Sequence, residues 1–186
     1  MSFDKMMIHH CAPTLCDIKP GNIFFVNRRD FSKAVFDKWY QALYFRGILC
    51  TAIELSDTSI AVYVCNVSWV RKILEDLFVH AYLLGKGYHG YGVFEFVETF
   101  KSRLQSEEGF PHEIGVALGY PVDDVIEFEN NEGKNCKYCG CWKSYTAVEK
   151  AKKCHCNYKN CSLLCEKLYS EGYSLDQIIS RYKKTA

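Results

Sequence analysis

Cysteine thiols are the side chains with the clearest chemistry in this sequence, and they gather in its C-terminal third. Cys136 and Cys139 are separated by two residues, a spacing that lets both thiolates bind one tetrahedral metal ion. Cys161 and Cys165 are four residues apart, so a helix would place them on one face. These spacings predict a Zn²⁺ or iron–sulfur site, and the alternative is a set of incidental thiols. The expected metal ligands are Cys136, Cys139, Cys141, Cys154 and Cys156.

A second candidate lies near the N-terminus, where His10 and Cys11 precede Pro13. Proline is favoured at the first position of a helix, so we expect a short helix over residues 13–18. Cys11 would lie just before that helix, where the helix dipole and the adjacent His10 favour the thiolate. Cys11 is therefore a candidate reactive thiolate or ligand, with His10 as base or ligand. The alternative is a buried cysteine at a chain reversal.

A third candidate is the pair His112 and Glu113, at the start of an acidic, helix-patterned segment. The two side chains can act as acid and base, with the glutamate orienting the histidine. The alternative is a first helical turn in which the helix dipole favours the glutamate.

Two further motifs favour structural roles. Gly85-x-Gly87-x-x-Gly90 matches a dinucleotide-binding fingerprint, but it follows a helix pattern instead of a strand. It is interpreted as a helix C-terminus and linker. Residues 111–128 resemble a helix-turn-helix, yet residues 107–133 contain eight acidic residues and no lysine or arginine. Because phosphate binding needs basic side chains, nucleic acid is not an expected partner, and a helical corner used for packing is favoured.

The composition is that of an ordinary globular protein. The 186 residues are 48% hydrophobic and 24% charged, which allows a normal core, and the net charge of +1 gives no reason to expect a nucleic acid or a membrane. No signal peptide or membrane-spanning run is visible. We therefore expect a cytoplasmic protein whose cysteines are mostly reduced thiols, metal ligands or redox groups.

The periodicity predicts an α+β fold: a small, mostly antiparallel sheet packed by helices, with a helical C-terminal part. Two strand patterns at 48–55 and 59–65 form an expected hairpin that is apolar on both faces. We expect a single domain over 1–186, with a possible helical subdomain at 146–186. Another strand is expected at 23–26 and a last one at 138–144, and helices are expected at 31–46, 69–84, 93–105, 111–118, 122–129, 146–169 and 174–183.

Three stretches resemble the bacterial family catalogued as domain of unknown function 3793, and the resemblance covers essentially the whole chain. They read HCAPTLCDIKPGNIF, FPHEIGVALGYPVDDVIEF and GKNCKYCGCWKSY. The resemblance implies a small cytosolic protein encoded near iron-uptake and flavodoxin genes, and it brings no activity with it. Cys136, Cys141 and the cysteines at 154–165 depart from the family pattern. The matching residues that bear chemistry are His10, Cys11, Lys19, Asn22, His112, Glu113, Cys139, Trp142 and Lys143.

These observations predict a redox- or metal-linked accessory protein of iron or thiol metabolism, with zinc or iron as its candidate cofactor. Cys11 would react, Lys19 and Lys143 would hold an anionic group together with Asn22, and Tyr138 and Trp142 would form an aromatic wall. The alternative is a non-catalytic binding or regulatory module. It would use residues 111–128 or the lysine-rich C-terminal helix to dock an acidic, flavodoxin-like redox protein.

Overall fold

The computed structural model describes residues 1–90, 92–106 and 109–185 of the chain. The chain forms two compact units, which are Met1–Asn66 with Asn157–Ala186 (unit 1) and Val67–Cys156 (unit 2). Residues 157–186 therefore belong with the N-terminal sheet. The expectation of one domain over residues 1–186 stays a prediction.

The sheet of unit 1 has three antiparallel strands in the order β1-β3-β2. They are β1 (Gly21–Asn27), β2 (Ile48–Glu54) and β3 (Ser59–Asn66). The expected hairpin is confirmed, since β2 pairs with β3 and Cys50 faces Val64 across the pair. Six consecutive residues of the central strand, Ile60–Cys65, are buried, as a strand with two apolar faces requires.

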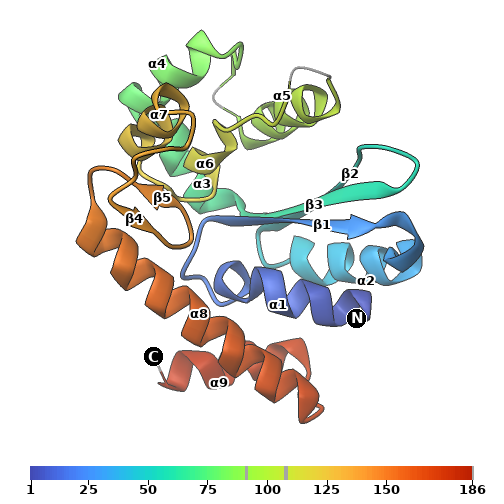
Figure 1. The fold of residues 1–186 in the computed structure, drawn as a ribbon. Helices are drawn as coiled ribbons and strands as arrows, with labels where there is room; N and C mark the ends of the chain where they lie inside the picture. The colour runs from blue at the N-terminus through green and yellow to red at the C-terminus, as the bar shows by residue number, and fades with distance from the viewer. Residues whose placement is uncertain (91, 107–108, 186) are drawn as a thin grey trace. The chain divides into compact units, whose positions relative to one another are not determined.

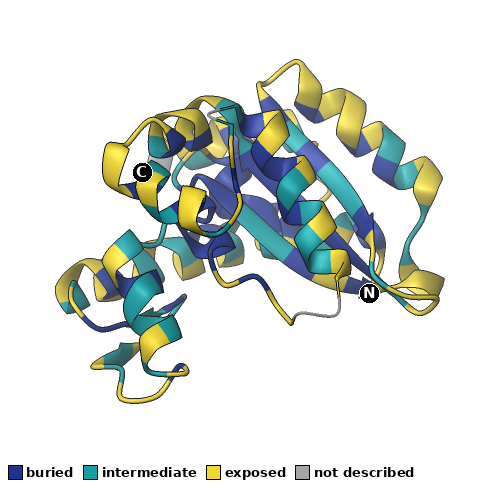
Figure 2. Ribbon diagram, turned by 90° about the horizontal axis from the view of Figure 1, so that it is seen from above, coloured by how far each residue is buried: buried dark blue, intermediate teal, exposed yellow. Residues whose placement is uncertain are grey.

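Helices α1 (Phe3–Leu15) and α2 (Lys33–Tyr44) lie side by side on one face of this sheet (Figure 1). The C-terminal part of α8 (Val148–Ser170) and α9 (Leu175–Thr185) complete the core of unit 1. A short 3₁₀ helix (Arg28–Asp30) links β1 to α2. Figure 2 shows buried positions along the strands, while the outward faces of the helices are exposed.

The expected helix at 13–18 is wrong, because α1 starts at Phe3 and contains Pro13 in its last turn. The hydroxyl of Ser2 caps the N-terminus by accepting a hydrogen bond from the backbone N–H of Lys5. Buried side chains along the helix, including Met7, anchor it against the sheet. Proline removes one helical hydrogen bond, and the helix ends two residues later at Leu15.

Unit 2 is mainly helical. Its helices are α3 (Val67–Leu74), α4 (Leu77–Gly85), α5 (Val93–Gln105), α6 (Ile114–Ala117), α7 (Val122–Asn130) and the start of α8. The strands β4 (Tyr138–Cys139) and β5 (Lys143–Ser144) form a small antiparallel pair. α5 and α7 confirm two expected helices, and the pair β4–β5 replaces the single strand expected at 138–144.

The single helix expected at 69–84 is instead two helices, α3 and α4. The carboxylate of Asp76 accepts hydrogen bonds from the backbone N–H groups of Phe78 and Val79, and so caps the start of α4. The glycine motif has the expected structural role, since α4 ends at Gly85 and Gly87 has a φ of 88°. The α+β class is confirmed. In the described part of the chain, no helix has both the length and the apolar character needed to cross a bilayer.

Candidate functional site

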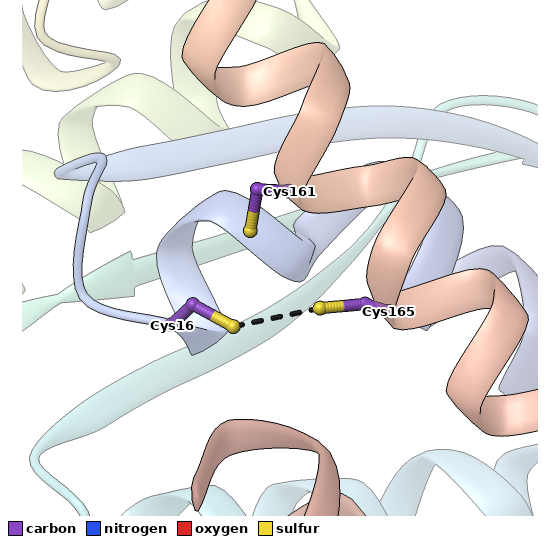
Figure 3. A group of neighbouring side chains, drawn as sticks. All are labelled: Cys16, Cys161 and Cys165. Carbon is purple, nitrogen blue, oxygen red and sulfur yellow. Dashed lines mark hydrogen bonds between the residues drawn. The ribbon is translucent and has the colours of Figure 1, made fainter. Parts of the chain in front are cut away.

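Three cysteine side chains of unit 1 meet inside its core (Figure 3). The Sγ atoms of Cys16, Cys161 and Cys165 all lie within 4.8 Å of one another, and those of Cys16 and Cys165 are 3.6 Å apart. All three residues are buried, and Cys161 has no exposed surface at all. Three thiols at this spacing can bind one thiophilic metal ion.

Two elements position these thiols. Cys16 follows the last residue of α1, where its backbone N–H donates to the carbonyl oxygen of Ala12. Cys161 and Cys165 lie one turn apart on α8 and point toward Cys16 (Figure 3). A contact of 2.6 Å between His9 Nδ1 and Glu166 Oε1 also joins α1 to α8. The cluster therefore lies where α8 packs against the end of α1.

The three thiols influence one another's ionisation. Hydrogen bonds from Cys16 and Cys161 lower the pKa of Cys165, although burial opposes this shift. Hydrogen bonds with Cys16 and Cys165, together with burial, raise the pKa of Cys161. Burial raises the pKa of Tyr182 on α9 to about 12, and the neighbouring Cys161 contributes to the shift. The cluster thus favours one thiolate, and a bound cation would stabilise the further thiolates.

The five metal ligands expected from the sequence are not assembled in this way. Cys16, Cys161 and Cys165 are the only group of three or more histidine, cysteine or acidic side chains close enough for one ion among the described residues. Two geometric reasons account for the difference. Cys139 pairs with Lys143 in the β4–β5 turn, and Cys154 and Cys156 are two residues apart on a helix, so they point to different sides.

The environment of Cys11 differs from the one expected. Cys11 lies within α1 and is completely buried, so a helix N-terminus does not act on it. Burial raises its pKa well above the ordinary value, and the nearby thiol of Cys50 adds to the shift. His10 stacks on the ring of Phe24 with centroids 4.8 Å apart, and burial lowers its pKa. Both side chains contribute to the packing of unit 1.

Lys19 and Asn22, expected to hold an anionic group, also contribute to the packing of unit 1. Lys19 is buried, and its ammonium lies 5.6 Å from the centroid of the Tyr158 ring. The side-chain oxygen of Asn22 accepts a hydrogen bond of 2.6 Å from the hydroxyl of Thr14. These contacts join β1 and the loop before it to α1 and α8.

Glu113 has partners other than the expected His112, and the acid–base pair stays a prediction. Its buried carboxylate accepts hydrogen bonds from Tyr88 (3.1 Å) and Arg103 (2.5 Å). A carboxylate in a low-dielectric interior needs such partners, and the residues after α4 and on α5 supply them. His112 instead packs against Phe128, with ring centroids 4.8 Å apart.

His112 lines a pocket of about 290 Å³ in unit 2, together with several other residues expected at a site. Cys139, Trp142 and Lys143 also line it, whereas Tyr138 is not among its lining residues. Tyr120 and Trp142 form a stacked aromatic wall, with ring centroids 5.0 Å apart. Several residues singled out from the sequence thus border one pocket, and their role in binding stays a prediction.

Asp124 holds the pocket wall in place. Its buried carboxylate accepts four hydrogen bonds of 2.8 Å: one from the indole N–H of Trp142, one from the backbone N–H of Tyr145, and two from the backbone N–H and hydroxyl of Thr146. Burial by itself raises the pKa of Asp124, but these hydrogen bonds outweigh it and lower that pKa below the ordinary value. The sequence did not predict this role of Asp124, since an acidic residue in the first turn of a helix is common.

The residues expected to form a single site lie in two different units. Cys11, His10, Lys19 and Asn22 belong to unit 1. His112, Glu113, Tyr138, Trp142 and Lys143 belong to unit 2. The single shared site stays a prediction. Cys16 was missed altogether, because its only sequence signal is one cysteine that lies 149 positions from Cys165.

Comparison with known proteins identifies a family. The family model described as "Protein of unknown function (DUF3793)" matches residues 7–179, so the chain belongs to this family. No curated protein and no solved structure was found to match the chain.

Proposed function

We propose that this member of the DUF3793 family binds one zinc ion through Cys16, Cys161 and Cys165. The supporting observation is the convergence of three buried Sγ atoms within 4.8 Å of one another. A tetrahedral ion with zinc–sulfur bonds of about 2.3 Å holds its thiolates about 3.8 Å apart. The thiols are therefore close to the spacing that a single ion requires.

The number of thiols favours one zinc ion over an iron–sulfur cluster. Such clusters are held by four cysteine thiolates, and the described residues supply three in one group. Structural zinc sites usually have four ligands, so a light-atom donor such as water would complete the set of three thiolates, and the hydroxyl of Tyr182 lies beside Cys161 as a hydrogen-bond donor. Three thiolates and one Zn²⁺ leave a single negative charge, which a hydrogen-bond donor in the core can stabilise.

Burial supports a structural role for the metal. The three thiols are enclosed in the core of unit 1, so a substrate would not reach an ion that they hold. Such an ion would link the end of α1 to α8, and the stability of unit 1 would then depend on metal supply. This is the form of metal-linked function that the geometry supports best.

Elemental analysis of the full chain, purified without oxygen, tests the proposal. We expect about one zinc per chain, and loss of most of it in the double variant Cys161→Ser/Cys165→Ser. The matched control is Cys136→Ser/Cys139→Ser, which removes the other plausible cysteine pair and should retain the metal. Metal-free wild-type protein, or metal that is lost only from the control variant, would rule the proposed site out.

A redox function is the second candidate, supported by the 3.6 Å contact between the sulfur atoms of Cys16 and Cys165. A small two-electron oxidant that can enter the core, such as hydrogen peroxide, would take two electrons and two protons from these thiols, leaving an S–S bond and two molecules of water. Intact-protein mass spectrometry after mild oxidation should then show a loss of two hydrogens, and peptide mapping should assign the bond to this pair. Under the zinc proposal, bound metal prevents that oxidation.

A further inference from the structure

Unit 2 contains a thiol–imidazole pair. The three cysteines of the proposed zinc site belong to unit 1. The Sγ atom of Cys141 is 3.4 Å from Nδ1 of His155, which is within hydrogen-bonding range for sulfur. Cys141 is only partly buried, so part of this residue is in contact with solvent. A thiol beside an imidazole can transfer its proton to that base and become a nucleophile.

The surrounding structure fixes both partners. Cys141 lies in the turn between β4 and β5, and the next residue, Trp142, is held by the buried carboxylate of Asp124. His155 lies on the first half of α8, and its ring packs edge-on against Tyr138 with centroids 6.4 Å apart. Cys141 therefore lies in a turn that hydrogen bonds stabilise, and His155 lies on a long helix. Such rigid elements favour a defined geometry for the pair over a chance contact.

Cys141 also lines the pocket of about 290 Å³, so this residue borders a space large enough for a small molecule. Aromatic rings of Tyr120, Phe128 and Trp142 contribute to the walls. A second thiol, that of the exposed Cys139, lines the same pocket. Aromatic walls and two thiols fit an apolar or aromatic compound that reacts with sulfur.

We propose that Cys141 is the nucleophile of a thiol–disulfide exchange site, with His155 as its base and a small aromatic disulfide as its substrate class. The imidazole takes the Cys141 proton, and the thiolate attacks one sulfur of the bound disulfide. A new S–S bond forms to Cys141 while the original S–S bond breaks. The departing thiolate takes the proton back from His155, so the products are a mixed disulfide and one small thiol.

The other cysteines of the chain provide the contrast. Cys50 and Cys65 are buried in the sheet, and burial raises the pKa of each to about 12. Cys139 and Cys156 are exposed, so they report how fast an accessible thiol reacts in this protein. If His155 activates Cys141, this half-buried thiol must react faster than both exposed ones.

Reaction of the full chain with 4,4′-dithiodipyridine, an aromatic disulfide, tests the site. The reagent is added below one equivalent at neutral pH with a chelator present, and the labelled cysteine is identified by peptide mass spectrometry. We expect the first mixed disulfide at Cys141, formed at least about tenfold faster than at Cys139 or Cys156. Equal or slower labelling of Cys141 would overturn the proposal without any variant being made.

The base is tested separately. His155→Gln should slow the labelling of Cys141 at neutral pH by at least about tenfold, and the rise of the labelling rate with pH should move to higher pH in this variant, because the thiol then loses its proton to water. The matched control is His89→Gln, which removes an exposed histidine of the same unit and should leave the rate unchanged. Circular dichroism confirms that both variants fold. A rate at Cys141 that is the same in His155→Gln and the wild type would remove His155 from the mechanism.

Discussion

Among single residues, two buried carboxylates provide hydrogen bonds that join several elements of unit 2. Asp124 joins α7 to the segment 142–146, and Glu113 joins α6 to Tyr88 and α5. Each carboxylate accepts hydrogen bonds from donors of its own unit, and Asp124 also lines the pocket of unit 2. Their substitution should therefore change stability before it changes chemistry.

Replacing Asp124 with asparagine should lower the free energy of unfolding by about 2 kcal/mol, because the charged acceptor of four hydrogen bonds is lost. Urea unfolding at neutral pH measures the change. The matched control is Asp123→Asn, one residue earlier and exposed, which should change stability by no more than about 0.5 kcal/mol. Equal effects of the two substitutions would contradict the role assigned to Asp124.

The same carboxylate predicts a pH dependence. The pKa of Asp124 is lower in the folded protein than its ordinary value of 3.8, so the unfolded chain binds the proton more readily. The contribution of Asp124 to stability is therefore complete above pH 3.8 and is lost as the pH falls through the lower folded value. Urea titrations at decreasing pH should show the wild type and Asp124→Asn converging in acid. A stability difference that grows in acid would have the wrong sign.

Glu113→Gln should lower the free energy of unfolding by about 2 kcal/mol, because it leaves Arg103 without its buried charged partner. Thermal and urea unfolding measure the loss. Glu98→Gln is the control, since Glu98 is exposed and pairs with Lys101 at 3.6 Å, a contact worth a few tenths of a kcal/mol. A folded, fully stable Glu113→Gln would show that the pair with Arg103 contributes little.

At the scale of elements, α8 carries both proposed sites. Its first turns hold His155, and later turns hold Cys161 and Cys165. The proposed zinc ion would fix the later turns to the end of α1, where the His9–Glu166 contact already acts. Local stability of α8 should therefore depend on metal along only part of its length.

Hydrogen exchange with and without a strong chelator tests this expectation. Metal removal should speed amide exchange in residues 157–170 and in α9, because the ion stabilises only the folded state. Exchange in α5 and α7 provides the internal control and should change little. Uniform acceleration throughout the chain would indicate global unfolding, and no change would indicate that no stabilising metal was bound.

For the whole molecule, local sequence patterns predicted the helices and strands better than they predicted the tertiary contacts between them. The apolar spacing of Val93, Val97 and Phe100 predicted α5, and the turn at 56–58 predicted the β2–β3 hairpin. The pocket residues His112, Trp142 and Lys143 were identified through segments close in sequence. Cys16 and Asp124 were not, because their partners are distant along the chain and residue spacing carries no information about such contacts.

Zinc K-edge X-ray absorption on the intact, anaerobically purified chain reports the ligands of the proposed zinc site. We expect about one bound zinc with three sulfur neighbours at about 2.3 Å and one lighter atom. The spectrum should be unchanged in Cys136→Ser/Cys139→Ser, and the three-sulfur signal should disappear in Cys161→Ser/Cys165→Ser. A zinc with four sulfur neighbours, a zinc with only nitrogen and oxygen neighbours, or protein without metal would contradict it.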